Sequence, residues 1–331
     1  MRGVILDRAS LGNKIDISSI AELFTEFKIY DETEEKSINS RIKDCDVVVA
    51  NKVKINRKHL ANNQSLKLIV ALATGVDNID LEGCREFNVN VSNARNYCTN
   101  SVAQHTFALI LSLTNKILLY HSEVLAGKWS GQTHFCLTHH PIEELNNKNL
   151  LIVGFGNIGK KVAQIAKSFG MQVTIASIPG HASSQGEHIQ RQELQQCLPE
   201  ADIITIHCPL NKMTKDLFTT EHFVRMKDSA LIINTSRGGI INEESLHQAL
   251  KERVIAGAAT DVLATEPPSK HHLFLQEPLP NLIVSPHCAW TGEQSKTQLL
   301  NEAVLNIKHF QSGSLINNID RKSTRLNSSH Q

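Results

Sequence analysis

The 331-residue sequence lacks the features that mark secreted, membrane and nucleic-acid-binding proteins. Its seven cysteines are odd in number and include no C-x-x-C pair, which argues against a disulfide framework and favours reduced thiols. No run reaches the roughly 18 apolar residues of a membrane span, and the apolar run near Met1 is too short for a signal peptide. A formal charge of +1 offers no electrostatic footprint for nucleic acid. We therefore expect a cytoplasmic protein without nucleic-acid or membrane partners.

Histidine is abundant, with sixteen residues, but the histidines are scattered along the chain. The adjacent pairs His139–His140 and His271–His272 cannot both face one metal ion from a regular helix or strand. The sequence therefore predicts no metal site.

The chain is long enough for two ordinary domains, since 41% of its residues are hydrophobic. Residues 321–331 differ in character, because they are polar and basic with a single leucine and cannot bury enough apolar surface to order themselves. They resemble a translated sequencing adapter. We expect this tail to be disordered and non-native, and not to be part of either domain.

Short apolar runs alternate with amphipathic stretches almost throughout. Strands are predicted at 3–7, 46–50, 66–72, 89–94, 150–154, 171–176, 201–209, 229–236, 254–262 and 281–287. Helices are predicted at 18–27, 55–63, 101–126 and 295–313, the third as one long helix without Pro or Gly. Such alternation predicts an α/β fold with two parallel sheets, both of whose faces are covered.

The stretch VGFGNIG matches the pattern G-x-G-x-x-G at Gly154, Gly156 and Gly159. A predicted strand precedes it and a predicted helix follows, which is the context that a dinucleotide-binding turn requires. The first glycine permits the tight turn, the second lets the backbone approach a pyrophosphate, and the third lets helix and strand pack closely. The pyrophosphate would bind the N–H groups at the start of the helix.

The residue at the end of the next strand is Ser177, where NAD-binding units place an acid about 20 residues after the glycines. A serine can hydrogen-bond a ribose hydroxyl but does not repel a 2′-phosphate. No arginine that could bind such a phosphate follows directly. NAD(H) and NADP(H) both remain open, with a slight preference for NAD(H).

Polar residues follow four later predicted strands. They are His207, Cys208 and Pro209, then Asn234, Thr235, Ser236 and Arg237, then Asp261 and Glu266, and finally His287. Because the carboxyl ends of parallel strands share one edge of a sheet, these side chains are expected to converge where ligands bind.

Three of these residues suit the oxidation of an alcohol by a nicotinamide. His287 can exchange the hydroxyl proton, because imidazole titrates near neutral pH. Glu266 can orient that imidazole and favour its protonated form. Arg237 can bind a substrate carboxylate with two N–H groups and polarise the neighbouring carbonyl.

The motifs GFGNIG, HCPL, INTSRGGIINEESL, DVLATEPP and SPHCAW occur in the order and spacing of the D-isomer-specific 2-hydroxyacid dehydrogenases, and the sequence resembles that family over nearly all of 1–315. The resemblance implies a flavodoxin-like substrate domain, 1–101 plus 293–320, into which a dinucleotide-binding domain, 102–292, is inserted. It also implies a homodimer formed through the long helix and the neighbouring arm. Arg237, Glu266 and His287 match the catalytic set of the family.

The resemblance further implies that backbone N–H groups around Thr74, Gly75 and Val76 bind the substrate carboxylate together with Arg237 and His287. Val102 is expected near the nicotinamide ring and Asp261 near its carboxamide. The remaining cofactor contacts implied are Gly154, Gly156, Asn157, Ile158, Gly159, Ser177, His207, Cys208, Pro209, Thr214, Thr235, Ser236, Arg237, His287 and Ala289.

Within the family, DRASLG, ANKV, HFCLTHHPIEEL and ASIPG are similar to bacterial glycerate dehydrogenases, also called hydroxypyruvate reductases. We therefore expect reduction of hydroxypyruvate or glyoxylate to D-glycerate or glycolate. The alternatives are a D-3-phosphoglycerate dehydrogenase and a dinucleotide-sensing protein like the corepressors of the family. A formate dehydrogenase is disfavoured, because its histidine would pair with Gln instead of Glu266. Lys52, Phe135 and Trp290 are further candidates for substrate contact.

Overall fold

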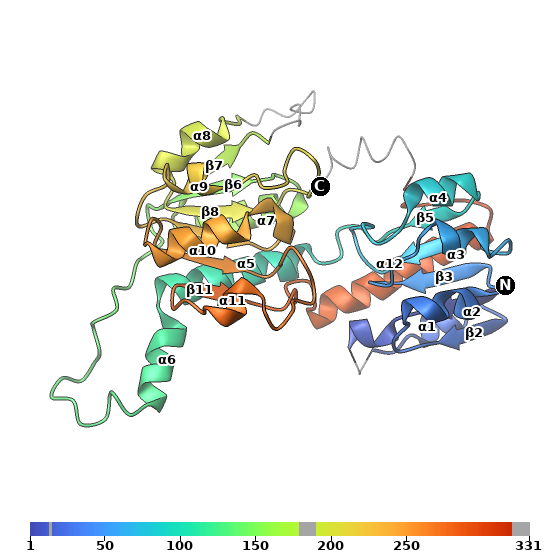
Figure 1. Cartoon of the computed structure of the whole chain (residues 1–331), viewed down its shortest axis with the longest axis horizontal. Coiled ribbons are helices and arrows are strands. Elements are labelled where there is room, and N and C mark those ends of the chain that lie inside the picture. The colour runs from blue at the N-terminus through green and yellow to red at the C-terminus, as the bar shows by residue number, and fades with distance from the viewer. Residues whose placement is uncertain (13–14, 179–189, 320–331) are drawn as a thin grey trace. The chain divides into compact units, whose positions relative to one another are not determined.

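The computed structural model describes residues 1–12, 15–178 and 190–319 and divides the chain into two compact units (Figure 1). Among the described residues, the first unit contains Met1–Cys98 and 290–319, and the second contains Thr99–Ala289. Each unit has one parallel sheet with helices on both faces, so the predicted α/β fold class is confirmed. The tail predicted at 321–331 lies outside the described residues.

The sheet of the first unit has the strand order β2-β1-β3-β4-β5, which is the flavodoxin-like order. Its strands are β1 (Arg2–Ile5), β2 (Glu26–Ile29), β3 (Val47–Ala50), β4 (Leu68–Ala71) and β5 (Asn90–Ser92). Its helices are η1 (Arg8–Leu11), α1 (Ser18–Ala21), η2 (Glu35–Ser37), α2 (Ile38–Ile42), α3 (Arg57–Ala61), α4 (Leu81–Glu86) and α12 (Glu293–Gln311).

Alternating side chains of these strands enter two separate cores. Val48 and Ile69 pack with α2, α3 and α4, whereas Val49 and Val70 pack with α1 and α12. Since successive strand residues point to opposite faces, continuous runs such as VVVA are buried on both sides. The helix predicted at 295–313 is therefore an integral part of the first unit.

The helix predicted at 18–27 is wrong in its second half. Helix α1 ends at Ala21, and Glu26–Ile29 form the edge strand β2, which pairs in parallel with β1. The segment EFKI alternates polar and apolar residues, and Phe27 stacks on Phe24 with ring centroids 5.0 Å apart. Pairing with β1 and this aromatic contact outweigh the helical pattern that precedes them.

The sheet of the second unit has the order β11-β10-β9-β8-β6-β7, and all of its pairings are parallel. Its strands are β6 (Asn149–Val153), β7 (Gln172–Ala176), β8 (Ile203–Ile206), β9 (Leu231–Asn234), β10 (Gly257–Thr260) and β11 (Leu282–Val284). All six strands predicted from Leu150 onward are confirmed.

Helices cover both faces of this sheet. One face packs against α5 (Thr99–Thr114) and α7 (Asn157–Ser168). The other face packs against α8 (Leu194–Cys197), η3 (Leu198–Glu200), α9 (Thr220–Phe223), η4 (Gly238–Ile240), α10 (Glu243–Lys251) and α11 (Leu273–Gln276). This is the doubly wound arrangement, which binds ligands at the carboxyl edge of the strands.

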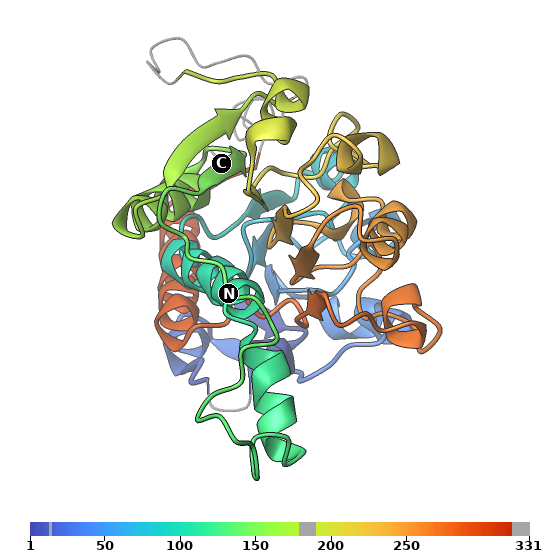
Figure 2. The same ribbon diagram turned by 90° about the vertical axis from the view of Figure 1, so that its left-hand side faces the viewer.

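The single long helix predicted at 101–126 is also wrong, because it is broken into two. Helix α5 ends at Thr114, and α6 (Ile117–Leu125) leaves it at an angle of 60° (Figures 1 and 2). Lys116 at the break has φ 55°, a left-handed conformation that ends an α-helix without glycine or proline. Within the described ranges no single helix passes the length and hydropathy test for a membrane span, and the bent pair α5 and α6 passes it only when taken together.

Candidate active site

The predicted polar residues follow the carboxyl ends of four neighbouring strands in the second unit, at one edge of the sheet. The strands β8, β9, β10 and β11 lie side by side and run parallel. His207 and Asp261 directly follow β8 and β10, while Arg237 and His287 lie three residues after β9 and β11. The expected convergence on the carboxyl edge is therefore present in the backbone.

His287 and Glu266 form a direct pair at this edge. The imidazole Nδ1 lies 2.5 Å from the Glu266 carboxylate oxygen Oε2, and the two side chains are 24% and 32% exposed. The other carboxylate oxygen, Oε1, accepts a hydrogen bond from the Leu263 N–H at 2.9 Å. Because the carboxylate is bound at both oxygens, it fixes the plane of the imidazole and leaves Nε2 as the nitrogen available for proton exchange.

The loop that carries His287 is held by the strand end beside it. The His287 backbone has φ 50°, and its N–H donates to the Asp261 carbonyl oxygen at 2.7 Å. The buried Asp261 carboxylate accepts hydrogen bonds from Ser285 Oγ at 2.6 Å, from Cys288 N–H at 2.9 Å and from Ala289 N–H at 2.8 Å. A left-handed histidine is sustained only when its surroundings fix it, as these bonds do.

Asp261 thus has a structural function that its expected contact with a carboxamide did not suggest. Both of its oxygens are used within the protein, and His105 Nε2 lies 3.5 Å from one of them. A buried carboxylate bound by several donors fixes the loop that it touches. The position of His287 therefore depends on Asp261.

Gly238 brings the segments of Arg237 and Glu266 together. A Cβ atom at Gly238 would lie 1.9 Å from the Leu263 carbonyl carbon, so only glycine permits this approach. On the other side, Asn234 Nδ2 donates to the Arg237 carbonyl oxygen at 2.8 Å. The turn after β9 and the loop before Glu266 are therefore in contact through their backbones.

The glycine turn has the geometry that its sequence predicts. Gly154 has φ 106°, and a Cβ there would lie 2.5 Å from the Cys208 nitrogen. A Cβ at Gly159 would lie 2.2 Å from the Gly154 carbonyl oxygen. Gly156 is the N-cap of α7, a helix of 12 residues, and offers no capping side chain. The helix N-terminus thus suits an anion such as a pyrophosphate.

His207 lies against this turn and has an unusual environment. Its backbone N–H donates to the Val153 carbonyl oxygen at 2.7 Å, yet neither ring nitrogen has a hydrogen-bond partner among the described residues. Burial lowers the pKa of His207 to about 3, so the imidazole is neutral at physiological pH. Buried polar atoms without partners are rare in proteins and are common where a ligand completes the site. A dinucleotide fits this turn and its histidine.

The other predicted cofactor residues of the second unit form a connected frame. Ser236 Oγ donates to the Cys208 carbonyl oxygen, and Thr235 Oγ1 lies 3.1 Å from Thr106 Oγ1. Thr214 Oγ1 donates to the Pro209 carbonyl oxygen at 2.6 Å and closes the HCPL turn. The remaining residues lie at the start of α5, at the start of α7 and beside Asp261, namely Val102, Asn157, Ile158 and Ala289.

Ser177 follows β7, as predicted, and a residue that the sequence analysis missed lies near it. The Ser177 N–H donates to the Gln192 carbonyl oxygen at 2.7 Å, and Ala176 pairs with Gln192 in a parallel bridge. Arg191 is consequently adjacent to this strand end in the backbone. The sequence does not indicate that Arg191 lies near Ser177, because no local pattern links residues so far apart in the chain.

The predicted substrate loop belongs to the first unit and follows β4. Thr74 Oγ1 donates to the Ala94 carbonyl oxygen at 3.0 Å, and the Asn93 side chain donates to the Thr74 carbonyl oxygen at 2.6 Å. Gly75 and Val76 are partly exposed, and exposed Lys52 follows the neighbouring strand β3. The loop thus lies at the carboxyl edge of its own sheet.

The two aromatic candidates have contrasting environments. Trp290 packs edge-on against Tyr97 within the first unit, with ring centroids 6.3 Å apart. Phe135 is 90% exposed on the segment that follows α6.

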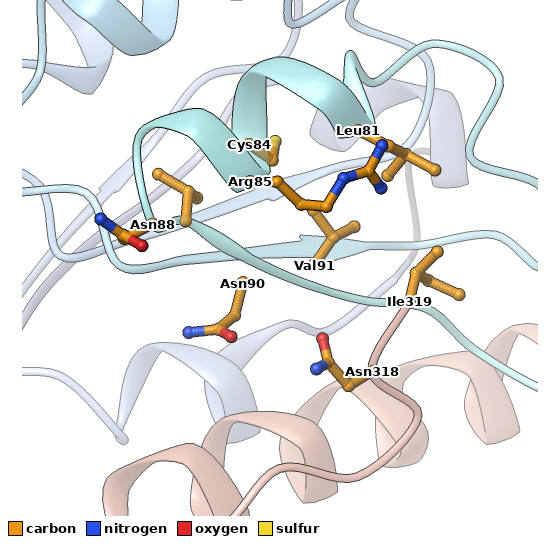
Figure 3. A pocket seen from close by; sticks show the side chains of 9 residues that line it. Leu81, Cys84, Arg85, Asn88, Asn90, Val91, Asn318 and Ile319 are labelled. Carbon is orange, nitrogen blue, oxygen red and sulfur yellow. The ribbon is translucent and has the colours of Figure 1, made fainter. Parts of the chain in front are cut away.

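A cavity of about 350 Å³ lies in the first unit beside β5 and contains none of the predicted site residues (Figure 3). Its lining is mixed, with one guanidinium and three carboxamides among apolar side chains. The lining residues are Leu81, Cys84, Arg85, Asn88, Val89, Asn90, Val91, Asn318 and Ile319. This cavity is separate from the residues that carry the predicted chemistry.

Gly154→Ala should weaken NADH binding by about tenfold or more, because the new Cβ collides with backbone atoms that cannot move away and adds about 1–3 kcal/mol of strain. The test is NADH titration followed by fluorescence. Gly127→Ala is the matched control, since Gly127 has φ 75° but nothing within 4 Å of an added Cβ. Equal NADH affinity in the two variants would contradict the assigned turn.

Comparisons with known proteins agree with this geometry. Residues 107–289 match the model of the D-isomer specific 2-hydroxyacid dehydrogenase NAD binding domain. The chain is 34% identical to a glycerate dehydrogenase of Methylorubrum extorquens, covering 94% of this chain and 96% of that one. It is 32% identical to a hydroxypyruvate reductase of Blautia hydrogenotrophica, covering 97% and 100% respectively.

A solved structure shares the fold across almost the whole chain. The D-lactate dehydrogenase of Aquifex aeolicus, complexed with NAD and lactic acid, is 26% identical and aligns with a TM-score of 0.78, covering 95% of this chain and 96% of that one. Three findings indicate the same family. They are the sequence identity to named enzymes over most of the chain, the family model that matches the second unit, and this shared fold. The chain therefore belongs to the D-isomer-specific 2-hydroxyacid dehydrogenase family of NAD(P)-dependent oxidoreductases.

Proposed function

We propose that this protein reduces hydroxypyruvate, and glyoxylate as well, to D-glycerate and glycolate in a reversible reaction. The names of the glycerate dehydrogenase and hydroxypyruvate reductase relatives support this substrate class. The observation that carries the chemistry is the 2.5 Å pair of His287 and Glu266 on the sheet edge that also bears the glycine turn.

In the proposed mechanism, His287 is the proton donor for the reduction. Glu266 occupies Nδ1, so protonated Nε2 gives its proton to the carbonyl oxygen of the 2-keto acid as the alcohol forms. In the oxidation the same nitrogen takes the hydroxyl proton. Glu266 is a positioning residue whose negative charge stabilises the imidazolium.

Arg237 is proposed to bind the substrate carboxylate and to polarise the adjacent carbonyl. A guanidinium presents two parallel N–H groups to a carboxylate, a geometry that a lysine cannot reproduce. The backbone N–H groups of Thr74, Gly75 and Val76 are proposed as additional donors to the same carboxylate.

The cofactor is NAD(H) or NADP(H), which supplies or accepts the hydride when bound. We propose that Gly154, Gly156 and the first turn of α7 hold its pyrophosphate, while His207 lies against the same turn. Ser177 is proposed to hydrogen-bond the adenosine ribose. Arg191 supplies a cation near this strand end, so the preference between NADH and NADPH stays open.

The organisation of the whole protein is also part of the proposal. We propose that 1–101 plus 293–320 form the substrate domain and 102–292 the dinucleotide-binding domain, in a cytoplasmic homodimer. Large apolar side chains exposed on α6 and the segment after it support a dimer surface, and they are Ile117, Leu118, Val124, Leu125, Trp129, Phe135 and Ile142. A molar mass in solution near 36.8 kDa would contradict the dimer.

Initial rates decide the activity. We expect the purified protein to oxidise NADH or NADPH fastest with hydroxypyruvate, more slowly with glyoxylate, and least with pyruvate and phosphohydroxypyruvate. The greatest kcat/KM with phosphohydroxypyruvate would favour a D-3-phosphoglycerate dehydrogenase. Binding of NADH without turnover of any of the four acids would favour a dinucleotide sensor and contradict the proposed enzyme.

A further inference from the structure

A cluster of three potential metal ligands lies far along the chain from the catalytic residues, on α6 and the segment that follows it. Glu123 on α6 faces both His139 and His140, and their ligand atoms all lie within 4.8 Å of one another. His139 Nε2 is 2.7 Å from Glu123 Oε2, and His140 Nε2 is 3.3 Å from Glu123 Oε1. Figures 1 and 2 show α6 and this segment extending away from the sheet of the second unit.

Adjacent histidines in a regular helix or strand cannot both bind one metal ion. His139 and His140 belong to neither a helix nor a strand, so this condition does not apply to them. Their ring centroids are 4.3 Å apart with planes inclined by 51°, and both Nε2 atoms converge on one carboxylate. The irregular backbone thus allows both adjacent imidazoles to face the same carboxylate, which a helix or strand would prevent.

The cluster is held in place by Tyr120, one helical turn before Glu123. The Tyr120 hydroxyl donates to the His140 carbonyl oxygen at 2.8 Å and accepts from the His140 N–H at 3.1 Å. The Tyr120 ring meets both imidazoles edge-on, at centroid distances of 5.7 and 5.1 Å. Ligand side chains supported in this way lose less conformational freedom when an ion binds.

One ligand atom in the cluster lacks a partner. His140 Nε2 is buried but makes no hydrogen bond to any described residue, although it faces Glu123. Buried polar atoms without partners call for a ligand, a water or an ion. The Glu123 side chain is only 12% exposed, and its carboxylate oxygens lie within 3.3 Å of Lys128 Nζ, His139 Nε2 and His140 Nε2.

We propose that Glu123, His139 and His140 form a binding site for a divalent transition-metal ion, with Zn²⁺ as its occupant. Two imidazole nitrogens and one carboxylate oxygen are a ligand set that Zn²⁺ accepts, and they leave a fourth position for water. The ion would join α6 to the segment that follows it.

The Lys128 ammonium is the competing cation. Its Nζ lies 3.1 Å from Glu123 Oε1, and its side chain is 60% exposed, so it can move into solvent when an ion binds. Removing this charge should favour the metal, because two cations would no longer compete for one carboxylate. Lys128→Ala is therefore expected to tighten Zn²⁺ binding several-fold.

A second trio, His105, Asp261 and Cys288, also has its ligand atoms within 4.8 Å. The Asp261 carboxylate already accepts three hydrogen bonds from the loop of His287, so this trio belongs to the candidate active site. Because Zn²⁺ could bind at either trio, Zn²⁺ binding by the wild-type protein alone would not locate the ion. The binding of variants must therefore be compared with that of the wild type.

The test is calorimetric titration of the full chain with Zn²⁺, supported by the visible absorption of bound Co²⁺. We expect one site in the wild-type protein that weakens about 10- to 100-fold or more in His139→Ala/His140→Ala. His121→Ala is the matched control, because His121 is exposed on the same helix and is expected to leave binding unchanged. The proposal is overturned if the wild type takes up no Zn²⁺, if the double variant binds Zn²⁺ as tightly as the wild type, or if Lys128→Ala weakens binding.

Discussion

His287→Ala should lower kcat for hydroxypyruvate reduction by about a hundredfold or more, the usual contribution of a positioned proton donor. The imidazole is paired with Glu266 at 2.5 Å and held on a left-handed backbone by Asp261, so the substitution removes the positioned proton donor. NADH binding should persist, because the glycine turn is unaltered. The measurement is steady-state turnover together with NADH titration of the same variant.

His271→Ala provides the matched control for this result. His271 is exposed and lies in the chain between Glu266 and His287, so its removal should leave kcat near the wild-type value. Wild-type turnover in His287→Ala would remove this histidine from the mechanism. If the variant lost both NADH binding and turnover, the side chain would instead have a structural function.

Arg237→Ala should lower kcat/KM for hydroxypyruvate by about 100-fold or more, equivalent to about 3 kcal/mol from two charge-assisted hydrogen bonds. The loss should affect the binding of both the ground state and the transition state, because the guanidinium contacts the substrate carboxylate in each. Arg237→Lys should recover only part of this loss, since an ammonium keeps the charge but not the parallel pair of N–H groups.

The control for Arg237 is Arg225→Ala, which removes an exposed arginine from the same unit. Its kcat/KM should remain within about twofold of the wild-type value, as is usual for surface substitutions. If Arg237→Ala also kept its kcat/KM, the substrate carboxylate would have to bind elsewhere.

Much of the fold follows from local patterns in the sequence. Buried parallel strands appear as continuous apolar runs, and all six strands of the second unit were predicted from such runs. Strand β2 was missed because an edge strand of four residues with one partly buried side chain carries little hydrophobic signal. The break at Lys116 was missed because a left-handed lysine has no sequence signature comparable to glycine or proline.

The residues of the candidate site were predictable to a similar degree. Topology alone brings the ends of β8 to β11 together, so residue type and position after a strand were sufficient to select His207, Arg237, Asp261 and His287. The hydrogen bonds of Asp261 to the loop of His287 were not predictable, because they depend on the course of an irregular loop.

Two further features that the sequence did not predict have the same cause. Arg191 precedes Gln192, whose backbone pairs with Ala176 at the end of β7 although the two residues are distant in the chain. His139 and His140 share one carboxylate only because their backbone is irregular. Apolar residues that recur with a period of 2 or 3.6 indicate strands or helices, and such patterns give no information about irregular segments.

The most direct measurement is a crystal structure of the protein with NADH and oxamate, an unreactive amide analogue of small 2-keto acids. Hydrogen-bond contact, about 2.6–3.2 Å, is predicted between His287 Nε2 and the amide carbonyl oxygen, with Glu266 still on Nδ1 and the Arg237 guanidinium on the carboxylate. Oxamate bound away from these three side chains, or His287 turned away from it with the Glu266 pair broken, would contradict the mechanism.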